Sequence, residues 1–211
     1  NFAGRIALAK MARWDPEKGW LASAEIVARL RDAGMRPLFI ARGGREAYGS
    51  DVLAAMRGAG LRIVQRTNQS GDLRGLVHSL SNVNDADVIQ LVDHVDPDSR
   101  RALFRASDVV LANSAHEPFG LVGLEAMAVG GVACTGCSGE DYAMPGRNAL
   151  VLQTSNSDEF MGLFRQVLAD GGYQASLRRA GRSTAKQFSW PEVIRTNLVP
   201  SLGLPLTALG A

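Results

Sequence analysis

The stretch VVLANSAHEPFGLVGLEAMAV, residues 109–129, holds the pattern that decides the fold of this chain. It begins with four apolar residues, 109–112, which predict a short buried strand. A polar loop follows, and beyond Pro118 the sequence predicts a helix over residues 119–129. A buried strand that leads through a loop into a helix is the repeating unit of a parallel α/β sheet.

The same alternation extends along most of the chain. Residues 5–9 predict a first strand, and residues 19–33 predict a helix with one apolar face that ends at Gly34. The other predicted strands are residues 37–41, 61–65, 88–92, 132–135 and 149–152, and the other predicted helices are residues 47–57, 71–80, 97–107, 158–169, 174–187 and 191–202. The pattern therefore predicts a doubly wound, mostly parallel, Rossmann-like α/β sheet with helices on both faces. One domain accounts for residues 1–202, and residues 203–211 have the composition of a tail or linker.

Composition and charge exclude several classes of protein. Hydrophobic residues make up 46% and charged residues 21% of the chain, which is typical of a globular domain rather than a disordered one. No apolar run reaches the roughly 20 residues of a membrane span, and the first residues lack the features of a signal peptide, so we expect a cytoplasmic protein. The net charge is only +2, with basic and acidic residues interleaved, which favours a small anionic ligand over nucleic acid.

The two cysteines form a Cys134-Thr135-Gly136-Cys137 motif. A zinc site needs about four ligands, and the sequence offers neither a second cysteine pair nor a nearby histidine pair. Redox pairs usually lie at the start of a helix, whereas this motif lies on or just after a predicted strand. We interpret the cysteines as two small, partly buried residues.

The loop after residue 112 carries the clearest chemical signal. Glu117 and Pro118 come just before the predicted helix, Gly120 lies in its first turn, and Glu125 follows eight residues after Glu117. The first turn of a helix leaves backbone N–H groups unpaired, and a glycine there allows a phosphate to approach closely. Glu117 would then accept hydrogen bonds from hydroxyl groups, and Glu125 would reach a ribose. By spacing alone, ordinary helix capping explains the same residues.

Residues 116–127 resemble the E-x7-E motif of family-4 retaining glycosyltransferases and their glycogen-synthase relatives, in the form E-x-F-G-L-x-x-x-E-A-M. Four further segments resemble motifs of that family in the same order. Residues 12–19 are similar to its G-R-L-x-x-x-K-G loop and residues 101–112 to its L-Y-x-x-A-D-V-x-V segment. Residues 146–149 are similar to its G-x-N-G turn, and residues 188–190 match its F-S-W signature. The resemblance therefore covers most of the chain.

The resemblance implies a role for each matching residue. Arg13 and Lys18 would neutralise the donor diphosphate, whose charge grows as the glycosidic bond breaks. Glu117 would hold the transferred sugar through its hydroxyls, and Glu125 would bind the ribose hydroxyls. Backbone N–H groups near the helix start would bind the phosphates, from Phe119, Gly120 and Leu121. The resemblance implies neither a metal ion nor a cofactor.

The surroundings of the donor are less clearly marked. Gly43 and Gly44 match a glycine-rich loop that relatives place near the donor, although a plain turn explains them equally well. Asp93, with His94 beside it, stands where relatives often have a glycine in the loop that shapes the base pocket. His116 flanks the motif and is a further candidate for contact with the donor.

The chain departs from the family motifs in two other places. Ala12 and Trp14 replace the glycine and the leucine on either side of Arg13. Residues 130–131, Gly-Gly, replace the usual Gly-x-Pro after the motif helix.

The resemblance implies a group 1 retaining hexosyltransferase of GT-B fold, with a donor such as UDP-glucose, GDP-mannose or ADP-glucose and a hydroxyl acceptor. In such enzymes a separate N-terminal domain binds the acceptor, and this chain would be the C-terminal, donor-binding half. We expect it to bind the donor but to transfer sugar slowly or not at all, and any peripheral contact with a membrane would come through the missing domain. The alternatives are a nucleotide-sugar-binding regulatory module and a sugar-nucleotide epimerase. An NAD-dependent dehydrogenase is disfavoured because no G-x-G-x-x-G follows the first strand.

Overall fold

The computed structural model describes residues 2, 4–68, 70–83, 85–138 and 141–202. They form one sheet in the order β3-β4-β2-β1-β5-β6-β7, and every neighbouring pair of strands is parallel. The strands are β1 (Ile6–Met11), β2 (Pro37–Arg42), β3 (Ile63–Arg66), β4 (Val88–Leu91), β5 (Val109–Ala112), β6 (Ala133–Thr135) and β7 (Leu150–Val151). The predicted parallel α/β sheet is therefore confirmed.

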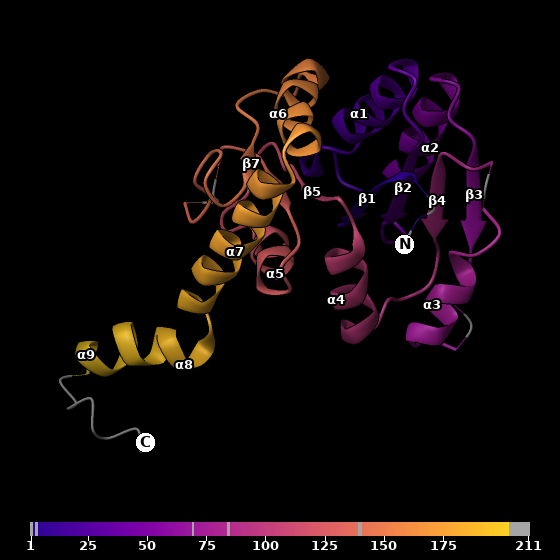
Figure 1. Cartoon of the computed structure of the whole chain (residues 1–211). Helices are drawn as coiled ribbons and strands as arrows, with labels where there is room; N and C mark the ends of the chain where they lie inside the picture. Colours follow the sequence, from indigo (N-terminus) through magenta and orange to yellow (C-terminus); the bar gives the residue numbers. More distant parts are fainter. Residues whose placement is uncertain (1, 3, 69, 84, 139–140, 203–211) are drawn as a thin grey trace.

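Helices cover both faces of this sheet (Figure 1). The helices are α1 (Trp20–Asp32), α2 (Tyr48–Gly58), α3 (Leu73–Ser79), α4 (Pro97–Ala106), α5 (Leu121–Ala128), α6 (Ser157–Ala169), α7 (Gly171–Gln187), α8 (Trp190–Val193) and α9 (Val199–Ser201), with a 3-10 turn at Pro16–Lys18 and a π-helical turn at Ile194–Leu198. Alternate residues of a strand point to opposite faces, so Leu8 packs in the core beneath α1, α2 and α6, whereas Ala9 packs in the core beneath α3, α4 and α5. Burial on both faces explains why the strands are apolar almost throughout.

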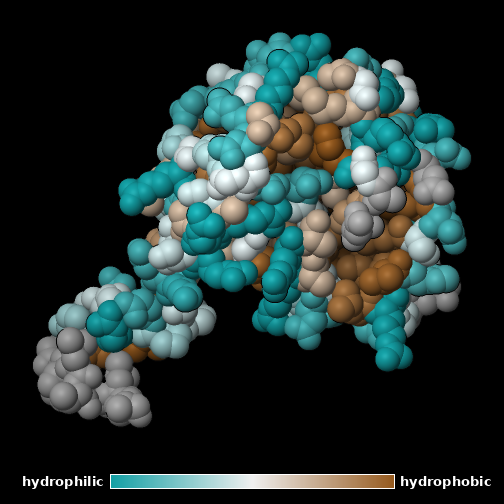
Figure 2. Space-filling model, viewed as in Figure 1, coloured by the Kyte–Doolittle hydropathy of each residue, from teal (hydrophilic) through white to brown (hydrophobic). Residues whose placement is uncertain are grey.

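The last predicted helix, residues 191–202, differs from the structure. The segment begins at Trp190 and is interrupted by the π-helical turn between α8 and α9. It forms an arm that stands away from the body of the domain (Figure 1). In the space-filling view, hydrophilic side chains cover most of the body on this face, and apolar side chains gather in a few patches (Figure 2). The predicted tail, residues 203–211, lies outside the described residues.

Two boundary differences affect the site. The first strand extends to Met11, two residues beyond the prediction, so that Lys10 belongs to β1 and is only 1% exposed. The predicted helix over 119–129 begins at Leu121, so that Phe119 and Gly120 remain in the loop that leads into α5. A lysine ordinarily marks the end of a buried strand, but here tertiary contacts accommodate its charge.

The strand order determines where a ligand can bind. β1 lies at the centre of the sheet between β2 and β5, and the chain winds outward from it in both directions. Ligands of open α/β sheets bind beyond the carboxyl ends of the strands at such a switch point. The loops after β1 and β5 meet there, which brings the two best-marked sequence motifs together.

Candidate functional site

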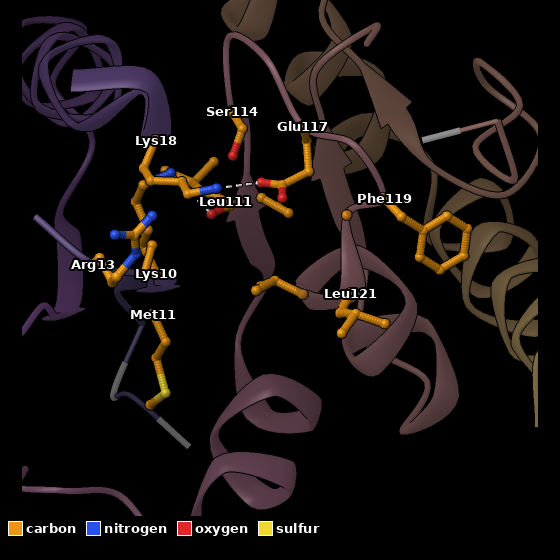
Figure 3. Close-up of a pocket in the computed structure, with 13 residues that line it drawn as sticks. Lys10, Met11, Arg13, Lys18, Leu111, Ser114, Glu117, Phe119 and Leu121 are labelled. Carbon is orange, nitrogen blue, oxygen red and sulfur yellow. Dashed lines mark hydrogen bonds and ion pairs between the residues drawn. The ribbon is translucent and has the colours of Figure 1, made fainter. Parts of the chain in front are cut away.

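A pocket lies at this switch point, between the end of β1, the end of β5 and the start of α5 (Figure 3). Its lining includes the predicted site residues Arg13, Lys18, Glu117, Phe119, Gly120 and Leu121. Four of the lining residues carry charge, namely Lys10, Arg13, Lys18 and Glu117. Three cations and one carboxylate give the lining a formal charge of +2, so the pocket suits an anion.

The start of α5 forms one wall of the pocket. Gly120 is the residue that caps this helix, and because it has no side chain it leaves the first backbone N–H groups without a side-chain acceptor from the cap. The Tyr142 hydroxyl donates a hydrogen bond to the Gly120 carbonyl. The Phe119 ring packs 5.9 Å from the rings of both Tyr142 and Phe188. These contacts fix the helix start beside the pocket, and they give the phenylalanine of the F-S-W segment a structural role.

The loops after β1 and β5 are joined directly. The backbone N–H of Ala115 donates to the Glu17 carbonyl at 2.7 Å. The Lys18 ammonium lies 2.6 Å from Glu117 Oε2, and both side chains are about four-fifths buried, at 19% and 20% exposed. Figure 3 shows these two side chains pointing toward each other from opposite sides of the pocket. The motif resemblance assigned Lys18 to the diphosphate of the donor and Glu117 to its sugar. In the structure these two side chains form an ion pair with each other.

Gly19 is the residue that lets the two loops approach so closely. Its φ is +65°, and a Cβ there would lie 2.0 Å from the Asn113 carbonyl oxygen. A left-handed backbone conformation favours glycine, and the missing side chain makes room for the neighbouring backbone. The glycine of the residue 12–19 motif is thus required by packing against the loop that leads to Glu117.

Lys10 lies on the floor of the pocket, and sequence reasoning gave it no role. Its ammonium donates to Asn113 Oδ1 at 2.7 Å and to the Leu111 carbonyl at 3.3 Å. It also lies over the Trp20 ring, 5.4 Å from the ring centroid, an attractive cation–π arrangement. Ser23 Oγ donates to the same Asn113 oxygen at 3.1 Å. The sequence features that could have pointed to Lys10 are its place directly after the predicted apolar strand and its position eight residues before Lys18.

Arg13 is the most exposed cation of the pocket, and its side chain is 69% exposed. Its guanidinium lies 3.8 Å from Asp15. Next to it, Glu46 accepts a hydrogen bond from the Trp14 backbone N–H at 2.9 Å, and this bond, with a smaller contribution from Arg13, lowers the pKa of Glu46 below its usual value. Glu46 therefore fixes the backbone beside Arg13, a contact that sequence reasoning missed.

Trp14, which replaces a leucine of the family motif, is buried and packs 4.1 Å from the Trp20 ring centroid. A Cβ on Gly43 would lie 1.9 Å from the Trp14 ring, and one on Gly49 would lie 2.7 Å from it. The Trp14 ring thus fills the space into which a side chain at position 43 or 49 would project. Gly43 has a packing reason, and its predicted contact with a donor stays a prediction.

Glu125 lies one turn beyond the pocket wall. It is four residues after Leu121, which places both on the same side of α5. Its Oε1 is 3.0 Å from Arg100 Nη2, which projects from α4. Arg100 had no role in the sequence-based prediction, because nothing in the spacing of residues 100 and 125 indicates contact.

Two other predicted residues are not among those that line the pocket. Asp93 accepts a hydrogen bond from the Asn68 backbone N–H at 2.9 Å, so its carboxylate stabilises the loop after β3. The His116 ring lies 3.2 Å from Ser138 Oγ, on the side of the loop after β6. The structure therefore brings Arg13, Lys18 and Glu117 together, and it gives Asp93 and His116 other contacts.

The cysteines differ in their environments. Cys134 is buried in β6, and burial raises the pKa of its thiol to about 12, while Cys137 is exposed. Both are free thiols, and Cys134 stays protonated near neutral pH. Within the described residues, no group of three or more His, Cys, Asp and Glu side chains is placed to hold a metal ion. The helices of those residues also include none with the length and apolarity to span a bilayer.

Comparison with known proteins decides the family. The model of the family described as "Glycosyl transferases group 1" matches residues 8–184, which is most of the chain. The chain belongs to this family. The glycosyltransferase assignment that the motif resemblance implied is thus confirmed at this level.

One curated relative and two solved structures illustrate the likeness. A D-inositol 3-phosphate glycosyltransferase of Salinispora tropica is 30% identical over 88% of this chain and 42% of its own length. The Anabaena protein Alr3699/HepE, solved in complex with UDP-glucose, is similar in fold, with a TM-score of 0.72 and 20% identity over 96% of this chain and 50% of that one. The C-terminal domain of the group 1 glycosyl transferase LpcC from Francisella tularensis has a TM-score of 0.65 and 16% identity over 87% of this chain and 86% of that one.

The lengths of these proteins also matter. The chain spans between a quarter and about two fifths of the length of the first curated relatives it matches. It spans half of the Anabaena structure. This group 1 domain therefore corresponds to part of those proteins.

Proposed function

We propose that this chain is the donor-binding half of a retaining glycosyltransferase and binds the diphosphate of a nucleotide sugar in the pocket between β1, β5 and α5. The observation that supports this most directly is the lining of that pocket, where Lys10, Arg13 and Lys18 face a single carboxylate. The start of α5 adds the partial positive charge of a helix N-terminus. A nucleoside diphosphate is the anion that these groups fit best in a group 1 glycosyltransferase.

In this proposal the cations contribute most when the bond to the sugar breaks. The leaving diphosphate then gains negative charge, and groups that stabilise this charge lower the barrier more than they strengthen ground-state binding. Arg13 and Lys18 contact the phosphate oxygens from one side, and the backbone N–H groups of residues 119–121 contact them from the other. The acceptor hydroxyl attacks on the face that the diphosphate leaves and gives its proton to the leaving phosphate oxygen, which retains the configuration of the sugar, and no metal ion is required.

The Lys18–Glu117 pair has a part in this proposal. The ammonium and the carboxylate lie 2.6 Å apart. When a nucleotide sugar enters, we propose that Lys18 turns to the phosphate oxygens and that Glu117 accepts hydrogen bonds from the sugar hydroxyls. Each charged group exchanges one strong partner for another, so opening the pair costs little once the whole donor is bound.

The relatives support a nucleotide-sugar donor and a second domain for the acceptor. The Anabaena neighbour was solved in complex with UDP-glucose and with UDP, and this chain matches half of its length. We propose that the acceptor binds to a domain outside this chain and that transfer takes place between the two. The chain alone would then bind the donor and transfer a hexose slowly or not at all.

Calorimetric titration with UDP-glucose, GDP-mannose and ADP-glucose tests the proposal. We expect micromolar binding of one of the three, weakened about tenfold or more by Lys18→Ala, because a charge-assisted contact to phosphate is lost. We expect Glu125→Ala to weaken binding through the ribose. The matched control is Lys186→Ala, which removes the same charge from an exposed position of α7. Absence of binding to all three donors, or equal binding by the Lys18 and Lys186 variants, would contradict the proposal.

A further inference from the structure

We propose that Arg100 is a positioning residue of the donor site, which holds the Glu125 carboxylate in place for the ribose hydroxyls of the nucleotide. The inference rests on the proposed function and deepens it, because it assigns a residue that controls recognition of the ribose. No motif of the sequence points to Arg100. Its assignment comes from the contact between two successive helices.

The geometry places Arg100 beside Glu125, one helical turn along α5 from the residues that line the pocket. Arg100 lies one turn into α4, and its Nη2 is 3.0 Å from Glu125 Oε1 on α5. Glu125 follows Leu121 by four residues, so it continues the side of α5 that lines the pocket. The two side chains are 39% and 37% exposed, so a ligand can reach the carboxylate. In the proposed binding mode, the ribose lies beyond the phosphates on this side of α5, next to the pair.

The pair leaves Glu125 free to bind a ligand. An ionised carboxylate has two oxygens and about four acceptor positions, whereas Arg100 contacts one oxygen. The second oxygen is available to accept hydrogen bonds from vicinal hydroxyls. An unpaired glutamate on a helix samples several rotamers, and binding must restrict them. Arg100 restricts them before the ligand arrives, so the ribose meets a carboxylate already in place.

A comparison within α4 separates this role from ordinary surface pairing. Arg101 pairs with Asp98 at 2.7 Å inside the same helix, and those side chains are 65% and 81% exposed. Such exposed pairs contribute little to stability. Arg100 instead extends to the neighbouring helix and contacts the second glutamate of the motif. The adjacent arginines thus have the same charge and backbone context, and Arg101 provides a matched control.

The test compares a nucleoside diphosphate with its 2′,3′-dideoxy analogue. The base is the one that binds most tightly among UDP, GDP and ADP, and the measured quantity is the ratio of the two dissociation constants from calorimetry. For the unchanged chain we expect the analogue to bind at least about tenfold more weakly, because hydrogen bonds to a charged group are lost. Arg100→Met should lower this ratio about three- to tenfold, the effect of a lost preorganised side chain. The lost positive charge weakens both ligands alike and cancels in the ratio.

Two further variants sharpen the result. Arg100→Lys should restore part of the ratio, because its ammonium still reaches a carboxylate as a point charge. Arg101→Met should keep the full ratio, and thermal melting of each variant shows whether it is folded. A ratio in Arg100→Met equal to that of the unchanged chain overturns the inference. A larger ratio also overturns it, because Arg100 would then compete with the ribose.

The experiment also separates this inference from the function on which it rests. If the unchanged chain binds none of the three nucleotides, the proposed function fails and the inference fails with it. If the chain binds a nucleotide but Glu125→Gln leaves the ratio unchanged, Glu125 does not bind the ribose and Arg100 has nothing to position. If Glu125→Gln lowers the ratio and Arg100→Met does not, the function stands and only the inference is wrong.

Discussion

The two sides of the candidate site are built differently. On the proposed phosphate side, the loops after β1 and β5 are joined by buried contacts of Lys10 and Gly19 with Asn113 and by the Lys18–Glu117 pair, whose side chains are about four-fifths buried. On the proposed ribose side, α4 and α5 are joined at Glu125 by one ion pair whose side chains are more than a third exposed. The contacts on the first side are mostly buried, and the ion pair on the second is closer to the surface.

This difference in burial determines how a substitution on each side of the site affects the protein. A contact in the buried network cannot be altered alone, because the neighbouring backbone and charges are fixed by the same packing. A half-exposed ion pair can be replaced with little effect on folding. We therefore expect changes on the phosphate side to affect stability and all nucleotides, and changes on the ribose side to affect discrimination among nucleotides.

Gly19→Ala should have the largest effect. It places a Cβ 2.0 Å from the Asn113 carbonyl oxygen and forces alanine into a left-handed conformation, so we expect a loss of about 2–4 kcal/mol in the free energy of unfolding. Urea denaturation measures it. The matched control is Gly34→Ala at the other end of α1, where φ is also positive, at +76°, but a Cβ would meet nothing within 4 Å. Equal losses in the two variants would show that the loops are not held together at Gly19.

Lys10→Met should have the next largest effect, which we expect in the affinity for the nucleoside diphosphate. It keeps the length of the side chain and lowers the formal charge of the pocket lining from +2 to +1. At an effective dielectric constant of about 20, two unit charges about 6 Å apart interact by about 3 kcal/mol, so we expect the loss of this charge to weaken the affinity for a diphosphate by at least about tenfold. Calorimetry with the preferred nucleoside diphosphate measures this loss. Lys186→Met, an exposed change on α7, should alter the affinity less than about twofold, and equal losses in the two variants would contradict a role for the Lys10 charge.

Glu117→Gln should have a smaller effect whose sign depends on the ligand. It releases Lys18 from its ion pair, so we expect a bare nucleoside diphosphate to bind about threefold more tightly. The nucleotide sugar should lose the contact between its hydroxyls and the carboxylate, so the affinity that the sugar adds should shrink. Paired titrations with the nucleotide and its sugar derivative measure both changes. Weaker binding of the bare nucleotide would indicate that Glu117 orients Lys18 rather than competing for it.

Much of the fold and part of the site could be predicted from the sequence. The alternation of apolar strands and helices predicted the parallel sheet, because both signals are local. The motifs predicted that the loops holding Lys18 and Glu117 belong to one site, and the structure places these residues 2.6 Å apart. Their contact with one another was not predicted, because the family motifs describe contacts with a ligand.

The residues that sequence reasoning missed have partners far along the chain. Lys10 contacts Asn113, and Arg100 contacts Glu125, through the register of β1 with β5 and the packing of α4 beside α5. Gly43 was predicted to lie near a donor. In the structure it packs against Trp14, the residue that replaces the leucine of the family motif, and the indole ring leaves no room for a side chain at position 43. Such contacts depend on tertiary packing, which a pattern in one sequence does not specify.

The central claim is that the pocket at the start of α5 binds a diphosphate, and one comparison tests it most directly. Calorimetric titration of the unchanged chain with the preferred nucleoside diphosphate and with the corresponding nucleoside isolates the two phosphates. We expect the diphosphate to bind at least about a hundredfold more tightly, and we expect added salt to reduce this advantage. Equal affinities for the two ligands would contradict it.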